Sequence, residues 1–317
     1  MTILRVRHLT TYSYTQPVRF GDHHMMFRPR DSHDQRLLSA DLKVSPAATD
    51  TWWIHDAFGN CVTNVSFSEP ASELNFETNI ALDHTPQMVP HFRTDERAKL
   101  WPFEYDPDIL PDLAPYIRVH SPSPELEAWA MKFTRAGLET ETGHLLMTMT
   151  MGVRESFVYS RRMDPGTQSP LLTLTNRKGT CRDFAWLMIE ACRCLGLAAR
   201  FVTGYIYVPA RDGSTLHGGG ATHAWVQVFL PGAGWVEFDP TNGIVGNKDL
   251  IRVGVAREPK QARPLSGSYV GDKADYLGMT VQVNVTSDAP APAKSLGAGR
   301  RVRAIQGDQL ALRPDER

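Results

Sequence analysis

The sequence has no excess of either charge. It contains 34 Lys and Arg residues against 35 Asp and Glu residues, which gives a net charge of −1 at pH 7. Nucleic acids and anionic membrane surfaces attract strongly basic proteins, so the bulk charge gives no argument for either partner. We therefore expect neither a nucleic-acid nor a membrane partner.

Long apolar runs are also missing. A helix needs about 20 consecutive apolar residues to cross a bilayer, and no stretch of this chain approaches that length. The first ten residues, "MTILRVRHLT", lack the apolar core of a secretory signal. These two absences predict a soluble, cytoplasmic protein.

Cysteine is scarce, with four residues at positions 61, 181, 192 and 194. Four unevenly spaced cysteines are too few for a disulfide framework in a chain of this length, so we expect reduced thiols. Cys192 and Cys194 point to different sides of a predicted helix, which argues against a shared zinc ion. With no metal motif, phosphate loop or dinucleotide-binding glycine pattern, we expect no metal and no cofactor.

The 317 residues favour two domains. From Ile3 to about Pro86, β-branched and aromatic residues alternate with turn formers, which predicts a β-sandwich or small barrel. Five prolines among residues 106–124 are hard to place in a helix or central strand, so we expect a linker there. The predicted domains are residues 1–110, β-rich; residues 111–287, catalytic; and residues 288–317, a flexible tail.

Beyond the linker the pattern is helical. Ser123 is a predicted N-cap of a helix that ends at Gly137, and a second helix is expected from about Thr142 to Glu155. Strands follow, including "ARFVTGYIYVP", "HAWVQVFLPG", "GWVEFDPTN" and, far downstream, "MTVQVNVTS". Helices followed by strands predict an α+β domain with an antiparallel sheet.

A cysteine stands where the stretch "NRKGTCRDFAWLMIEACRCLGL" changes from loop to helix. Thr180 is the expected N-cap and Asp183 its capping-box partner, so that Cys181 is the first helical residue and Gly196 ends the helix. The helix dipole and free backbone N–H groups at this end favour the thiolate over the thiol. A lone cysteine is more often a small core residue, so the helix alone does not establish catalysis.

Two strands supply the partners that such a thiol needs. His223 shares one strand face with Trp225 and Gln227, and Asp239 lies on the matching face of the next strand. A short hairpin through "PGAG" makes the strands antiparallel, which brings His223 and Asp239 together directly or diagonally. A histidine beside a carboxylate can take a proton from a thiol.

These residues resemble a known family. The blocks "GTCRDFAWLMIEACRCLGLAARFVTGY" and "HAWVQVFLPGAGWVEFDPTN" are similar to the Cys, His and Asp blocks of the transglutaminase-like superfamily, in the same order. The resemblance implies Cys181 as nucleophile, His223 as base and Asp239 as its orienting partner. It also implies an α+β fold: an N-terminal β-sandwich-like domain, then a papain/transglutaminase-like domain whose nucleophile helix packs on an antiparallel sheet.

Five further residues are candidates for oxyanion or substrate contacts. Tyr159 occupies a position where relatives often carry an aromatic residue, and its hydroxyl could donate to an oxyanion, although a packed strand tyrosine is as good a reading. Asn242 could simply make a turn after Pro240. The other candidates are Thr180, Asp183 and Trp225, and His217 is a rival base in a glycine-rich loop.

The expected chemistry is attack of the Cys181 thiolate on an amide carbonyl of a peptide or protein, with a thioester intermediate. Hydrolysis, by a cysteine peptidase or amidase, is the favoured outcome, because the chain has no recognisable calcium loop. A protein or peptide transglutaminase is the alternative. A catalytically silent peptide-binding module is a further one, and the oligomeric state stays open.

Overall fold

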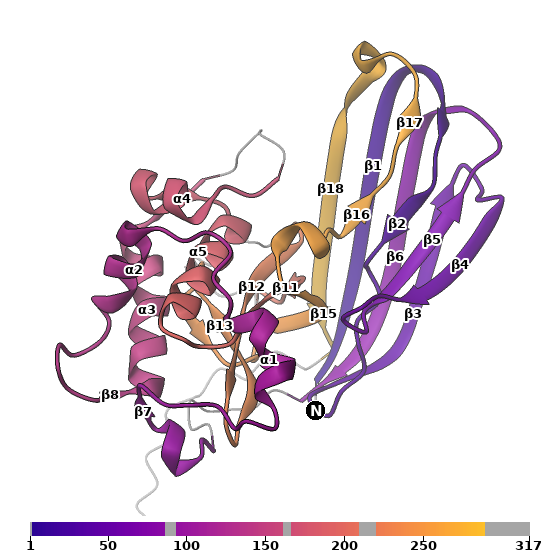
Figure 1. Cartoon of the computed structure of the whole chain (residues 1–317). Coiled ribbons are helices and arrows are strands. Elements are labelled where there is room, and N and C mark those ends of the chain that lie inside the picture. The colour runs from indigo at the N-terminus through magenta and orange to yellow at the C-terminus, as the bar shows by residue number, and fades with distance from the viewer. Residues whose placement is uncertain (1, 86–92, 161–165, 209–219, 289–317) are drawn as a thin grey trace, which may run out of the picture.

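In a computed structural model the described residues are 2–85, 93–160, 166–208 and 220–288, and they form two β sheets followed by a helical part with its own sheet (Figure 1). The first sheet has the strand order β3, β6, β1, β18, with β17 also paired to β1. Its strands are β1 (Thr2–Phe20), β3 (Gln35–Ser45), β6 (Ala71–His84), β17 (Tyr269–Val270) and β18 (Tyr276–Ser287).

The second sheet is shorter and has the order β16, β2, β5, β4. Its strands are β2 (His23–Met25), β4 (Asp50–His55), β5 (Cys61–Ser66) and β16 (Leu265–Ser266). Apolar residues from both sheets, among them Met25, Val65, Leu74 and Phe76, form one buried cluster. This shared cluster holds the two sheets together, because every other residue of a strand points to the same face.

The C-terminal strands return to the first part of the chain, which the sequence did not predict. "MTVQVNVTS" was expected in the second domain, but β18 pairs with β1 in antiparallel register from Leu4–Ser287 to Tyr14–Tyr276. Figure 1 shows the yellow β18 beside the indigo β1. Such pairing joins residues more than 250 positions apart, and no local pattern carries that information. The range 111–287 therefore includes strands of the N-terminal sheets.

The helical part contains five helices among the described residues. They are α1 (Leu110–Ile117), α2 (Pro124–Met131), α3 (Thr142–Ser156), α4 (Pro170–Asn176) and α5 (Cys181–Cys194). Short strand pairs join β7 (Leu100–Trp101) to β8 (Thr140–Glu141), and β9 (Val158–Tyr159) to β10 (Lys178–Gly179). Single turns of 3₁₀-helix cover Glu96–Ala98, Pro259–Gln261 and Lys273–Asp275.

Helix boundaries partly match the sequence prediction. Ser123 caps α2, since its side chain accepts a hydrogen bond from the backbone N–H of Leu126, but α2 ends at Met131 instead of near Gly137. The expectation that the proline-rich segment holds no helix is wrong, because α1 lies within it. Pro111 falls in the first turn of α1, where a missing N–H costs nothing.

The backbone of the proline-rich segment is hydrogen-bonded to two charged side chains of α5 that form a buried ion pair. Glu190 and Arg193 are joined at 2.7 Å, and both side chains are fully buried. Glu190 accepts hydrogen bonds from the backbone N–H groups of His120 and Ser121, and Arg193 donates to the carbonyl of Tyr116. The charges thus satisfy backbone groups that would otherwise be buried without partners.

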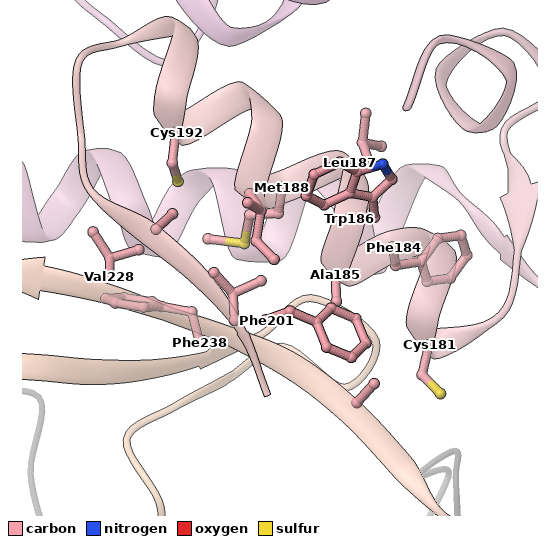
Figure 2. Packing of buried hydrophobic residues seen from close by; sticks show 14 of the residues in the cluster. Cys181, Phe184, Ala185, Trp186, Leu187, Met188, Cys192, Phe201, Val228 and Phe238 are labelled. Atoms are coloured by element: carbon pink, nitrogen blue, oxygen red, sulfur yellow. The ribbon is translucent and has the colours of Figure 1, made fainter. Parts of the chain in front are cut away.

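A five-stranded antiparallel sheet lies against α5, with the order β14, β13, β12, β11, β15. Its strands are β11 (Ala199–Ile206), β12 (His223–Leu230), β13 (Gly234–Asp239), β14 (Ile244–Val245) and β15 (Leu250–Ala256). Figure 2 shows apolar side chains of α5 facing Phe201, Val228 and Phe238 of the sheet. The same buried cluster includes Leu4 and Leu82 of the first sheet, so one core spans both parts. No helix of the described ranges is both long and apolar enough to cross a membrane.

Candidate active site

Cys181 is the first residue of α5, where the sequence places it. The preceding Thr180 is the N-cap and has extended backbone angles, with φ −95° and ψ 175°. Figure 2 shows Cys181 at the end of the helix, beyond Phe184 and Ala185, whereas Cys192 lies further along it. Cys181 is buried, with 6% of its surface exposed. Its thiol experiences the positive end of the helix dipole.

The loops around this helix end are fixed by Asp183. Its carboxylate accepts hydrogen bonds from the backbone N–H and hydroxyl of Thr180, at 2.8 and 2.9 Å, and from the backbone N–H of Gln168 at 2.7 Å. A Cβ on Gly179 would lie 2.9 Å from the Asp183 Cβ, so only glycine fits beside this carboxylate. Asp183 therefore holds the approach to Cys181 in place and is itself fully buried.

Tyr159 lies on the neighbouring short strand. It pairs with Gly179 in the parallel β9–β10 ladder, two residues before Cys181. Its half-buried ring packs on the main core cluster. The structure thus places Tyr159 near the N-terminus of α5, as a residue packed on the core.

His223 and Asp239 meet across β12 and β13. Val226 pairs with Phe238 in this ladder, a register that makes His223 and Asp239 diagonal neighbours. The His223 Nε2 lies 2.8 Å from Asp239 Oδ2, and both side chains are fully buried. Asp239 Oδ1 accepts a hydrogen bond from the backbone N–H of Thr241, which fixes the carboxylate on its other side.

The charges of this pair favour the protonated imidazole. Burial alone would lower the pKa of His223, but the Asp239 charge and hydrogen bond outweigh it, and Cys181 adds to them, so that the pKa is raised. Burial would raise the pKa of Asp239, yet the His223 charge and the hydrogen bonds it accepts lower it. His223 Nδ1 is buried and makes no hydrogen bond of standard geometry within the described residues. Cys181 is nevertheless close enough to raise the pKa of the imidazole.

Two other predicted residues surround the pair. Asn242 donates to Asp239 Oδ2 at 2.8 Å and lies 3.4 Å from His223 Nε2, so it shares the carboxylate with the histidine. Trp225 is fully buried, and its ring stacks near the His223 imidazole with centroids 5.9 Å apart. On β11, Gly204 is the residue that pairs with His223 of β12. A Cβ on Gly204 would lie 2.7 Å from the Trp225 ring, so glycine leaves room for this ring. These contacts restrict the orientation of the imidazole.

Arg182 is a residue at the site that sequence reasoning missed. It donates hydrogen bonds to the carbonyls of Pro259 and Ala262, and its guanidinium stacks over Phe201. Burial lowers its pKa, while the charge of the neighbouring Cys181 raises it, so the cation and a Cys181 thiolate stabilise each other. Its position next to the cysteine was the available signal. The rival base His217 lies outside the described residues.

The described ranges contain no cluster of three or more His, Cys, Asp or Glu side chains that could hold a metal ion. The fold and the site define a protein in which the first residue of a helix, Cys181, lies near His223 of an antiparallel sheet, and this histidine is hydrogen-bonded to Asp239. Two family models match the sequence: residues 4–83 match the bacterial transglutaminase-like N-terminal region, and residues 128–240 match the transglutaminase-like superfamily. The chain belongs to the transglutaminase-like superfamily.

Two mycobacterial proteins are similar to this chain over most of its length. A Mycobacterium tuberculosis H37Rv protein is 26% identical over 290 residues, which cover 88% of this chain and 91% of the relative. A Mycobacterium leprae protein is 29% identical over 301 residues, which cover 88% of this chain and 98% of the relative. Both are named as uncharacterized.

A solved structure shares the fold. A protein from Cytophaga hutchinsonii, a candidate cysteine protease, superposes with a TM-score of 0.68 at 20% identity. The match covers 92% of each chain, so it extends over the N-terminal sheets as well as the helical part.

Proposed function

We propose that this protein is a cysteine-dependent acyl-transfer enzyme that hydrolyses amide bonds of peptides or proteins. The observation that carries the proposal is the buried hydrogen bond between His223 and Asp239. Against the effect of burial, Asp239 and, to a smaller extent, Cys181 raise the pKa of His223. An imidazolium held in this way stabilises a neighbouring thiolate, which is the attacking species in cysteine catalysis.

The reaction has two halves. The Cys181 thiolate attacks the amide carbonyl carbon, and the tetrahedral intermediate collapses as the C–N bond breaks and His223 gives its proton to the leaving amine. A thioester remains on Cys181. Water then attacks the thioester carbonyl, His223 accepts a proton from that water, and the acid leaves as the Cys181 sulfur is released. Asp239 keeps the ring oriented, with Nε2 toward the carboxylate and Nδ1 available to the thiol.

The backbone N–H groups at the start of α5 are the candidates for oxyanion donors, because the first turn of a helix leaves such groups unpaired. Tyr159, on the strand beside Gly179, is a side-chain candidate for the same role. Replacing Tyr159 with Phe separates the two, since it removes the hydroxyl and leaves the ring packing unchanged.

Amine transfer uses the same acyl-enzyme and differs only in the group that attacks the thioester. Incubation with a library of peptide amides, in the presence and absence of a primary amine, separates the two by product mass. Hydrolysis gives an acid product in both samples. A dominant amide product in the amine sample would instead assign a transglutaminase, and the absence of any product in both samples would favour a peptide-binding module.

Three substitutions test the residue roles. We expect Cys181→Ala to abolish turnover and Asp239→Asn to lower it by roughly 10⁴-fold, because a neutralised carboxylate no longer holds the ring in the working tautomer. Cys194→Ala is the matched control, since Cys194 is a partly exposed thiol at the far end of the same helix. Equal turnover of wild type and Cys181→Ala would contradict the proposal.

A further inference from the structure

A pocket lies on the helical part's sheet, and Cys181 is not among its lining residues. The pocket has a volume of about 510 Å³ and lies between the loop of residues 30–34 and strands β11, β12, β13 and β15. Volumes of 300–1,000 Å³ are typical of small-molecule sites. Gln227 belongs to its wall and stands four residues along β12 from His223, or roughly 13 Å at the usual rise of a strand.

A row of polar side chains crosses the floor of this pocket. Arg200 Nε donates to Gln227 Oε1 at 2.8 Å, and Gln227 Nε2 donates to Glu237 Oε1 at 2.6 Å. Arg252 forms an ion pair with the same Glu237 and, at 3.1 Å, with Asp34 of the N-terminal part. Arg252 is therefore paired with two carboxylates, whereas Arg200 is hydrogen-bonded to a neutral amide.

Arg200 is the cation in this row without a carboxylate. Its guanidinium lies over the Trp235 ring at 4.0 Å, which fixes its plane. Among the described residues, none accepts a hydrogen bond from Nη1 or Nη2, since Nε alone is bonded. Burial, with Arg252 and Arg30 nearby, lowers the pKa of Arg200 to about 9. Arg200 is partly exposed and belongs to the pocket lining, so a group bound in the pocket can reach its free guanidinium edge.

The formal charge of the lining sets the charge of the missing group. Four arginines, at positions 30, 93, 200 and 252, face three acids, at positions 31, 34 and 237, which leaves one positive charge if His33 is neutral. A planar guanidinium edge binds a carboxylate through two parallel hydrogen bonds. A phosphate dianion would exceed the available charge and would meet the three acids of the lining. The indole of Trp235 and the neighbouring Ala233 and Val236 provide apolar contact for an organic group.

We propose that this pocket binds an organic monocarboxylate through the Nη1 and Nη2 edge of Arg200. The carboxylate comes from a free small molecule or from the C-terminus of a peptide, because both offer the same group. In this pocket Arg252 links Asp34 of the N-terminal part to Glu237 of β13. The strand β13 also carries Asp239. The proposal concerns binding alone and does not depend on catalysis by Cys181.

Binding is measured by isothermal titration calorimetry on the full chain, in a zwitterionic buffer at pH 7. The probes are acetate, benzoate, a tripeptide with a free C-terminus, the same tripeptide amidated, and inorganic phosphate. We expect saturable binding of at least one carboxylate, at least tenfold weaker in Arg200→Gln and unchanged in Arg7→Gln. Arg7 is the matched control, because it is an exposed arginine paired with Glu77 in the first sheet.

The outcomes divide clearly. Binding of the free but not the amidated tripeptide, with weak benzoate binding, assigns a peptide C-terminus, and tighter benzoate binding assigns a small molecule. Tighter binding of phosphate than of every carboxylate would overturn the proposal, and so would the absence of saturable binding to wild type. Equal affinities in wild type and Arg200→Gln would do the same. If Arg200→Gln does not fold, Arg93→Gln at the exposed rim should weaken the same binding about threefold.

Discussion

Burial makes two of the thiols on α5 unreactive. It raises the pKa of Cys192 to about 12 and that of Cys194 to about 11, so at neutral pH each is almost entirely in the unreactive thiol form. Cys192 also contacts Met149 inside the core. Cys181, in contrast, begins the helix and lies beside His223 and Arg182.

This difference predicts selective alkylation. At pH 7 and limiting iodoacetamide, we expect Cys181 to be modified at least about tenfold faster than Cys192 or Cys194, because the thiolate is the reacting species. Peptide mass spectrometry at several times measures each rate. His223→Gln should slow the reaction of Cys181 without accelerating the others. Similar rates at all three positions would remove the case for a special thiol.

The buried pair of His223 and Asp239 makes stability depend on pH. Burial alone would lower the pKa of the histidine, but Asp239 raises it to about 10. A raised pKa gives stability that is complete below the unfolded value, about 6.5, and is lost as the pH rises toward the folded value. The lowered pKa of Asp239 gives stability that is complete above about 3.9 and is lost on acidification.

We therefore expect the contribution of the pair to be greatest between about pH 4 and pH 6.5. The measurement is the free energy of unfolding of wild type minus that of the double variant His223→Gln/Asp239→Asn, at pH values from 4 to 10. The double variant removes both titrations and leaves no unpaired charge. A difference that grows steadily from pH 7 to pH 10 would have the wrong sign for a stabilised imidazolium.

At the scale of helices and strands, the sequence predicts those features that depend on residues close together in the chain. The start of α5 followed from Thr180 and Asp183, and the facing of His223 and Asp239 followed from strand parity and a short hairpin. Helix α4 was missed, although Ser169 before Pro170 is a helix-start signal and its side chain does accept from Leu172 N–H. The pairing of β18 with β1 has no such signal, and neither has the ion pair of Arg252 with Asp34, because both join distant segments.

Asp183 connects three segments at the start of α5, and this predicts a large effect from a small change. Asp183→Ala leaves the partly buried N–H groups of Thr180 and Gln168 without their acceptor, at a cost of about 1–3 kcal/mol for each group. We expect urea denaturation to show a total loss of roughly 2 kcal/mol or more. Asp183→Asn keeps one carbonyl acceptor and should lose less. If both variants matched wild type, the carboxylate would not be holding this turn.

At the scale of the whole molecule, the two parts share one core. Leu4 and Leu82 of the first sheet belong to the same buried cluster as Phe184 of α5 and Phe201 of β11. His8 of β1 is hydrogen-bonded to the hydroxyl of Tyr205 on β11 at 3.0 Å, again across the two parts. Domains that share a core are expected to unfold together, unlike domains joined by a linker and a small polar interface.

Leu82→Ala tests this coupling from a distance. Leu82 is fully buried on β6, and its truncation should cost about 2–5 kcal/mol. If the parts unfold as one unit, this change in the N-terminal sheet accelerates labelling of Cys192 in α5, because that thiol becomes reactive only when its helix opens. Labelling is followed by mass spectrometry in low urea. Leu38→Ala is the control, since Leu38 lies on neighbouring β3 but is 51% exposed, and it should change the labelling little. Should Leu82→Ala melt the N-terminal strands by circular dichroism while Cys192 stays protected, the parts fold independently and the shared cluster is only a docking contact.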